Sequence, residues 1–145
     1  MKRRKVLLTV TGVTSDFGET DDAMRLITTG TLTREKDMWK LRYEENQVDS
    51  NEKRRITMTM DDGVVTMARD GAWGTNMVFQ QGRRFETSYN TPFGAFGMGI
   101  FPTQVNYSVD DTGRGEVSLK YQLDIQGQFT SVNDLKISFS ENKQA

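Results

Sequence analysis

Apolar and polar residues alternate along most of this chain with the period of two that is typical of β-strands. The clearest alternation covers residues 116–125, where every second residue is apolar and the residues between them are polar or charged. A strand with this pattern buries one face and exposes the other to solvent. No stretch shows the period of an amphipathic helix, so the pattern predicts an all-β protein.

Ten alternating runs follow one another, separated by short segments rich in turn-forming residues. They cover residues 5–14, 23–33, 38–46, 55–60, 64–69, 72–81, 83–91, 97–109 and 116–125, with a last strand that carries Leu135, Ile137 and Phe139. Asp62-Gly63 and Asp70-Gly71 separate two pairs of runs, and Asp-Gly supplies the positive φ angles of a type I′ hairpin turn. Successive hairpins predict an antiparallel up-and-down (meander) β-barrel of about eight to ten strands, with a β-sandwich as the alternative.

The segment from Gly82 to Gly99 occupies the middle of the chain and contains one of its two prolines. A strand-like run ends at Pro92, and a corner rich in glycine and phenylalanine follows it. We therefore predict that residues 92–98 join one half of the sheet to the other, with room for one helical turn. The apolar parity shifts around Phe101 and Pro102, and proline cannot donate to a strand ladder, so a β-bulge or a strand edge is expected there.

Composition excludes much of the usual chemistry. The chain has 145 residues, which suits a single domain over residues 1–145, and it contains neither cysteine nor histidine. Thiolate nucleophiles, imidazole bases and Cys- or His-ligated metals are therefore absent, and we expect no catalysis, no cofactor and no metal site. No apolar segment is long enough to cross a bilayer, and the run after the basic residues 2–5 does not fit a secretory signal. We expect a cytoplasmic protein with no membrane partner.

Short motifs also stand in a defined order along nearly the whole chain. They are Tyr43-Glu44-Glu45, Arg69-Asp70-Gly71, Met77, Phe79, the run Tyr89-Asn90-Thr91-Pro92-Phe93-Gly94, and Tyr121. In order and spacing they resemble the YwiB-like family of small bacterial proteins of unknown function. The resemblance implies a lipocalin-like (calycin) meander barrel and favours the barrel over the sandwich. It implies no activity, because the family has no established catalytic or binding residues to carry over.

The predicted inward faces of the strands suggest a place for a ligand. A barrel of about eight strands is either filled by side chains or wide enough for one small molecule. Inward methionines can adapt to an irregular shape, and buried tyrosines need hydroxyl partners. With Arg69 or Glu45 at a strand end, such tyrosines could orient a bound molecule. We expect a small, largely apolar ligand in the barrel interior and mouth, contacted by Trp39, Tyr43, Arg69, Met77, Phe79, Phe85, Tyr89, Phe93 and Tyr121.

Two alternatives stay open. A barrel with a filled core would serve as a structural or interaction module, as a homodimer that uses the outward residues Met38 and Phe101. Basic residues at 2–5, 53–55 and 83–84, near aromatic residues in strands, would suit a groove for single-stranded nucleic acid. The net charge of −1 argues against this groove, and basic residues also protect edge strands from aggregation. We therefore expect no nucleic acid partner.

Overall fold

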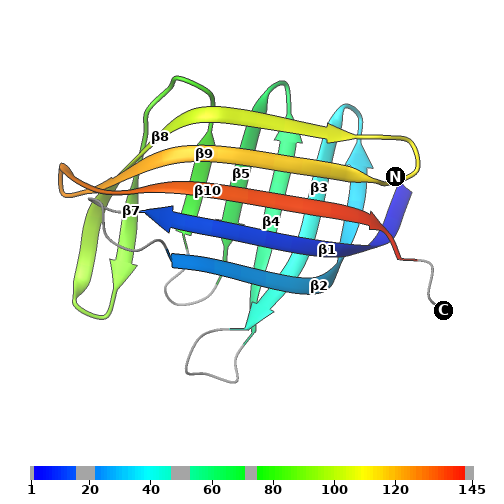
Figure 1. Cartoon of the computed structure of the whole chain (residues 1–145), viewed down its shortest axis with the longest axis horizontal. Coiled ribbons are helices and arrows are strands. Elements are labelled where there is room, and N and C mark those ends of the chain that lie inside the picture. The colour runs from blue at the N-terminus through cyan, green and yellow to red at the C-terminus, as the bar shows by residue number, and fades with distance from the viewer. Residues whose placement is uncertain (1, 16–21, 47–52, 71–74, 143–145) are drawn as a thin grey trace.

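The computed structural model describes residues 2–15, 22–46, 53–70 and 75–142, and within these ranges the chain forms ten strands and no helix (Figure 1). The described residues therefore include no helix that is long and apolar enough to cross a membrane. In chain order the strands are β1 (Lys2–Ser15), β2 (Asp22–Glu35), β3 (Met38–Asn46), β4 (Lys53–Asp61), β5 (Val64–Arg69), β6 (Thr75–Phe79), β7 (Phe85–Thr91), β8 (Gly94–Val109), β9 (Gly115–Ile125) and β10 (Gln128–Glu141).

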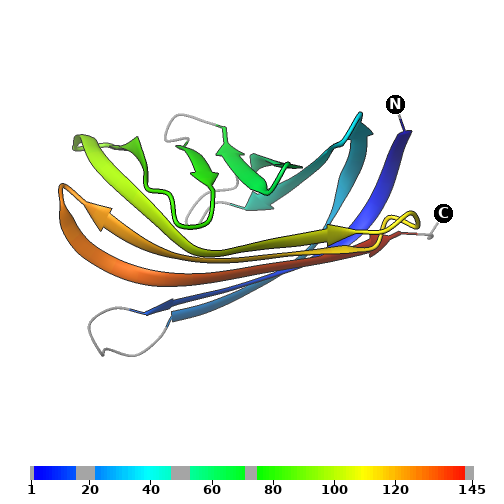
Figure 2. The ribbon, with the colours of Figure 1, turned by 90° about the horizontal axis from the view of Figure 1, so that it is seen from above.

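All ten strands belong to one antiparallel sheet with the order β6-β5-β4-β3-β2-β1-β10-β9-β8-β7. Consecutive strands of the chain pair with each other except β6 and β7, and β1 pairs with β10 along residues 6–15 and 132–141. The sheet rolls up so that the long strands β1, β10, β9 and β8 curve across the shorter strands β4, β5 and β6 (Figure 2). The predicted meander barrel is confirmed, and it is nearly closed.

The two halves of the sheet meet at a different place from the one predicted. Residues 92–98 form no joint and no helical turn, because β7 and β8 pair directly across a tight turn from Thr91 to Gly94. The edges that face each other are β6 and β7, and the chain passes between them at residues 80–84. There the Gly82 N–H donates a hydrogen bond to the Pro102 carbonyl at 2.9 Å. The predicted bulge is confirmed, since the register between β8 and β9 shifts after Pro102.

The hairpin turns follow the predicted chemistry where the structure describes them. Asp62 and Gly63 have φ angles of 51° and 78°, as a type I′ turn requires. Gln126 and Gly127, at 54° and 78°, make a second turn of this kind that the sequence pattern did not single out. Gly71, in the other predicted Asp-Gly turn, and the beginning of the predicted strand 72–81 lie outside the described residues.

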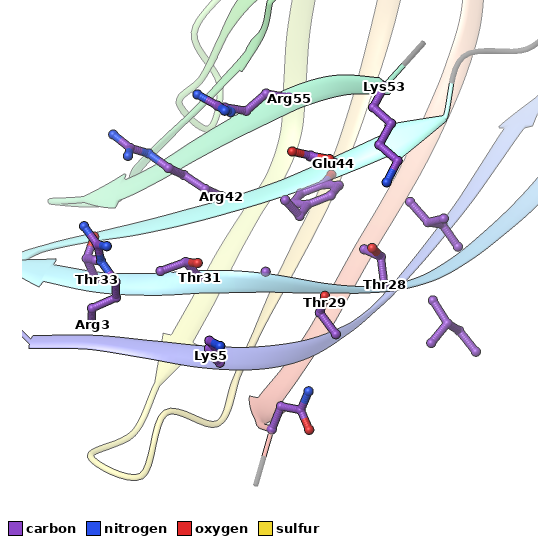
Figure 3. A pocket seen from close by; sticks show the side chains of 15 residues that line it. Arg3, Lys5, Thr28, Thr29, Thr31, Thr33, Arg42, Glu44, Lys53 and Arg55 are labelled. Carbon is purple, nitrogen blue, oxygen red and sulfur yellow. The ribbon is translucent and has the colours of Figure 1, made fainter. Parts of the chain in front are cut away.

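Strands β2 and β3 separate halfway along their length (Figure 3). Pairing between them begins at Glu35 and Met38 and ends at Gly30 and Tyr43, whereas β1 follows β2 along nearly its whole length. The first part of β2 has no β3 beside it, so neighbouring side chains cover its inward face poorly. Met24, which has the same parity as the buried Leu32 on this strand, is consequently 48% exposed. This separation creates the groove discussed below.

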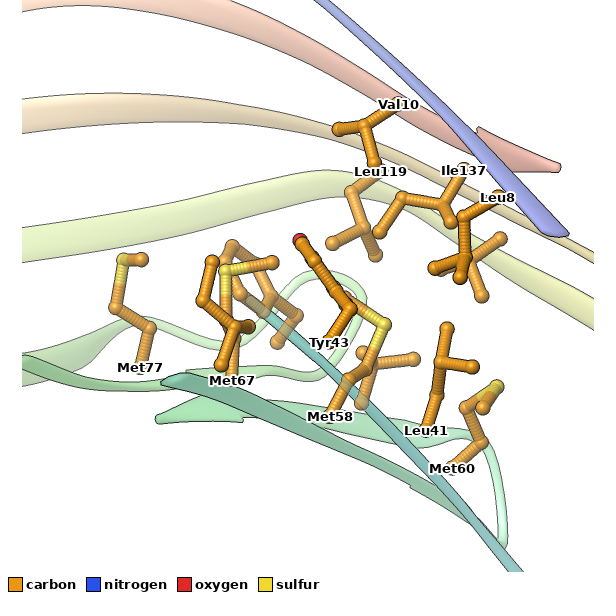
Figure 4. Close-up of a cluster of buried hydrophobic side chains, with 14 of the residues drawn as sticks. Leu8, Val10, Leu41, Tyr43, Met58, Met60, Met67, Met77, Leu119 and Ile137 are labelled. Atoms are coloured by element: carbon orange, nitrogen blue, oxygen red, sulfur yellow. The ribbon is translucent and has the colours of Figure 1, made fainter. Parts of the chain in front are cut away.

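The core lies between the two walls of the rolled sheet (Figure 4). On one wall, strand pairing places Leu41, Met58, Met67 and Met77 in one row across β3 to β6. Side chains of β1, β9 and β10 face this row from the other wall in Figure 4, and they include Leu8, Val10, Leu119 and Ile137. Methionine is flexible enough to fill the uneven space between two strongly twisted walls. The predicted use of methionine on the inward faces is confirmed for β4 and β6.

Candidate functional site

One further row of the inner wall carries polar groups. Tyr43 on β3 pairs in register with Ile56 on β4, Ile56 with Arg69 on β5, and Arg69 with Thr75 on β6. Because side chains alternate along a strand, these residues face the same side as the methionine row two residues away. We call the end of the barrel formed by Tyr43, Glu45, Arg69, Thr75 and Tyr121 the polar end. It brings together Tyr43, Arg69 and Tyr121 from the predicted ligand contacts.

Arg69 is the charged centre of the polar end. Its Nε lies 3.3 Å from Glu45 Oε1, and the side chain is 30% exposed, so the pair is partly screened by solvent. Although the two charges balance, the buried Arg69 Nε makes no hydrogen bond to any described residue. Thr75 Oγ1, on the neighbouring strand, is also buried and has no hydrogen-bond partner in the described part of the chain. Most buried polar atoms in proteins are hydrogen-bonded, so two such atoms at one end of the barrel call for an explanation.

The two tyrosines of the polar end are buried beside this arginine. Burial raises the pKa of Tyr43 to about 12, an effect that the nearby Arg69 charge reduces and the Glu45 charge increases. Burial likewise raises the pKa of Tyr121, against the opposing charge of Arg69. Tyr121 also packs edge-on against Phe79, with ring centroids 4.9 Å apart. Both tyrosines therefore stay protonated at neutral pH and can serve as hydrogen-bond donors.

A second set of polar residues lies inside the barrel and was not predicted from the sequence pattern. Asn133 pairs in register with Tyr121, and Thr14 of β1 pairs with Asn133. Asn133 accepts a hydrogen bond from the Thr14 hydroxyl at 2.9 Å and donates one to Ser131 Oγ at 3.0 Å. Small polar residues at inward positions interrupt the alternation, so the only available signal was their parity with the apolar residues of the same strand.

The remaining predicted contacts divide between the core and the surface. Met77 and Phe79 are buried in the apolar core, and Phe85 packs against its edge. Trp39 also packs against the core but sits beside the β2–β3 turn, at the far end of β3 from Glu45, with the Arg34 guanidinium 5.2 Å from its ring centroid. These residues shape the barrel, but they do not all meet at one site.

The prediction for Phe93 is wrong. This residue stands in the tight β7–β8 turn and is 92% exposed, so it does not line the barrel interior or mouth. A turn of this kind directs the side chain at its tip away from the sheet. Tyr89 lies within β7, but its side chain is outside what the structure describes.

Met38 and Phe101, the two outward residues predicted for a homodimer, do not lie on neighbouring strands. Met38 on β3 and Phe101 on β8 are separated in the sheet by the four strands β2, β1, β10 and β9. Both residues have outward parity, but parity alone does not tell how far apart two strands lie. Among the described residues, no group of three acidic side chains is placed to hold a metal ion.

The three predicted basic clusters have different environments. Arg84 is tied to the Asp124 carboxylate by two hydrogen bonds, of 2.6 and 2.8 Å, and it also pairs with Glu86. Arg4 pairs with Glu141 at 3.5 Å. Other members of Arg4's own cluster, together with residues of the 53–55 cluster, contribute to one groove, which is lined in part by Arg3, Lys5, Lys53 and Arg55.

Comparison with known proteins agrees with this architecture. The model of a domain of unknown function, DUF1934, matches residues 8–137. The crystal structure of the YwiB protein from Bacillus subtilis superposes with a TM-score of 0.84, covering 97% of this chain and 94% of that one, at 20% sequence identity. At this identity the likeness establishes a shared fold. No curated protein matches the chain. The predicted YwiB-like relationship is confirmed, and the chain belongs to the DUF1934 family, whose function is unknown.

Proposed function

We propose that this protein is a non-catalytic binding protein that holds a small amphipathic molecule at the polar end of its barrel. The apolar part of the ligand lies against the methionine-lined interior, and a head group that accepts hydrogen bonds lies beside Arg69 and Thr75. The observation that carries the proposal is a pair of buried atoms, Arg69 Nε and Thr75 Oγ1, that make no hydrogen bond to the described residues. The oxygens of a ligand carboxylate can accept from both groups, and the Arg69–Glu45 contact at 3.3 Å is an ion pair without hydrogen-bond geometry.

A buried donor without a hydrogen bond costs about 1–3 kcal/mol, so a ligand that satisfies both atoms recovers part of that energy on binding. Flexible methionines next to the polar row can rearrange around an apolar chain. An Arg69 charge already balanced by Glu45 favours a head group that completes its hydrogen bonds rather than one held by charge alone.

The protonation of the site favours binding over catalysis. With a pKa of about 12, Tyr43 keeps its proton at neutral pH and acts as a donor rather than as a base. The chain has no histidine or cysteine to supply a base or nucleophile of the usual kind. The polar groups are therefore suited to orienting a molecule and holding it in place.

Titration calorimetry with dodecanoate and dodecan-1-ol tests the proposal, because these molecules share a chain length and differ in the head group. We expect dodecanoate to bind at one per barrel and more tightly than the alcohol. Arg69→Gln should weaken dodecanoate binding about tenfold, since a charge-assisted hydrogen bond is lost. The control Arg25→Gln removes the same charge from an exposed position on β2 and should leave binding unchanged. Absence of binding, or equal loss in both variants, would refute the proposal.

A further inference from the structure

A groove of about 840 Å³ opens where β2 separates from β3 and β4, on the outer side of the sheet (Figure 3). Its lining holds five cationic side chains and one carboxylate, namely Arg3, Lys5, Arg42, Lys53, Arg55 and Glu44. Five positive charges and one negative charge give this lining a formal charge of +4, although the whole chain carries −1. Positive charge is thus concentrated on one face of a nearly neutral protein.

The cations come together because of strand parity and register. Lys5 of β1 pairs with Thr31 of β2, and Thr31 pairs with Arg42 of β3, which places the three side chains in one outward row. Arg55 of β4 pairs with Glu44, two residues further along β3. Adjacent strands lie about 4.8 Å apart, so a row of this kind brings charges from distant parts of the chain within reach of one ligand.

The groove cations are available to a ligand. All five are exposed, and within the described ranges none of their side chains forms an ion pair with a carboxylate. Four other cations of the described chain are, by contrast, paired with acids: Arg4, Arg84, Lys120 and Lys136. Clustered like charges without counter-charges raise the local concentration of anions.

The groove chemistry selects for phosphate. Guanidinium groups match phosphate oxygens in a two-pronged geometry, and lysine adds a point charge. The hydroxyls of Thr29 and Thr31 line the groove between these cations and can donate further hydrogen bonds. Tyr43 is the aromatic residue of the described lining and is only 4% exposed, so the described part of the groove offers no ring on which a base could stack.

We propose that this groove binds a ligand through its phosphate groups, with Arg42 and Arg55 as the principal contacts and Lys5, Lys53 and Arg3 around them. The same chemistry is presented by a free polyphosphate and by the backbone of a nucleic acid strand. Because the contacts are to phosphates, binding depends on charge and little on base sequence. Tyr43 borders both this groove and the polar end, but the five cations of the groove are not residues of the polar end, so the proposal does not depend on the function proposed above.

Fluorescence anisotropy with a labelled oligouridylate, with inorganic tripolyphosphate as competitor, tests the proposal. Arg42→Gln combined with Arg55→Gln should weaken binding roughly tenfold or more and reduce the slope of log K against log salt by about 1.4, or 0.7 for each lost phosphate contact on a single strand. The control combines Lys120→Gln with Lys136→Gln, which removes the same charge from exposed residues of β9 and β10. The control should bind like the unmodified protein.

The results of this experiment distinguish a free polyphosphate from a nucleic acid strand as the ligand. Displacement of the oligonucleotide by tripolyphosphate supports a general phosphate site. Direct calorimetric binding of tripolyphosphate alone identifies a free polyphosphate, and oligonucleotide binding that resists tripolyphosphate identifies a nucleic acid strand. The proposal is overturned if neither probe binds at low salt, or if the control loses as much affinity as the groove variant. Circular dichroism of both variants confirms that they are folded, as expected for substitutions at exposed positions.

Discussion

Replacing Gly30 with alanine tests whether the close approach of β2 to β1 and β3 at this point requires a residue without a side chain. Gly30 is the last residue of β2 to pair with β3, and its backbone lies tightly between two strands. A Cβ atom there would overlap the Arg42 carbonyl oxygen and lie 2.8 Å from Leu8 Cδ1. A backbone oxygen cannot rotate away, so the strands themselves would have to move apart.

The expected loss of stability follows from two opposing effects. Forcing an extra methyl group into a well-packed interior costs about 1–3 kcal/mol. Alanine also restricts the unfolded chain, which returns about 0.4–1 kcal/mol. The net destabilisation is therefore about 1–2 kcal/mol, which for a domain of this size lowers the melting temperature by roughly 3–8 °C.

Gly97→Ala is the matched control, because this glycine also lies in a strand but has space beside it. A Cβ atom at Gly97 would approach only Gln126 Oε1, at 3.7 Å. Urea unfolding of both variants should show a lower midpoint for Gly30→Ala and an unchanged or slightly higher one for Gly97→Ala. Equal midpoints for Gly30→Ala and the unmodified protein would show that the sheet yields at this point and would refute the steric argument.

Two further predictions concern pH. The pKa of Tyr43 is raised from 10.0 to about 12, so its contribution to stability is complete below pH 10 and is lost as pH rises through 12; Tyr43→Phe should remove this alkaline loss in unfolding curves measured across that range. The hydrogen bonds from Arg84 lower the pKa of Asp124 below 3.8, so the Arg84–Asp124 pair stabilises the fold above that pH and is lost below it. Asp124→Asn should therefore flatten the acid limb of the stability profile, and an unchanged limb would exclude a role for this pair.

Most of the fold could be predicted from local patterns. Alternation identified the strands, and the Asp-Gly pair at residues 62–63 identified a type I′ turn that the φ angles confirm. The bulge near Pro102 was also predictable, because proline cannot donate to a ladder and the apolar parity shifts beside it. The exposed position of Phe93 was not predictable. Phe93 lies close in sequence to other predicted contacts, but this does not fix the direction in which a turn points its side chain.

The candidate sites, like the fold, could be predicted from the sequence only in part. Tyr43, Arg69 and Tyr121 could be proposed together from residue type and parity, and the structure places both tyrosines within the electrostatic influence of Arg69. The polar partner Thr75 was missed because threonine is common in strands and gives no distinctive signal. The groove was missed because Arg42 is isolated among other residue types in the sequence.

The sequence by itself determined the all-β class, the strands, several turns and the inward or outward side of most residues, because each depends on neighbours only a few positions apart. The tertiary structure decided where the sheet closes, with β1 beside β10 and the open edges at β6 and β7. It also decided that basic residues from β1, β3 and β4 meet in one groove. Strand partners and register are set by burial and twist over the whole sheet, and the alternation within one strand carries no information about them.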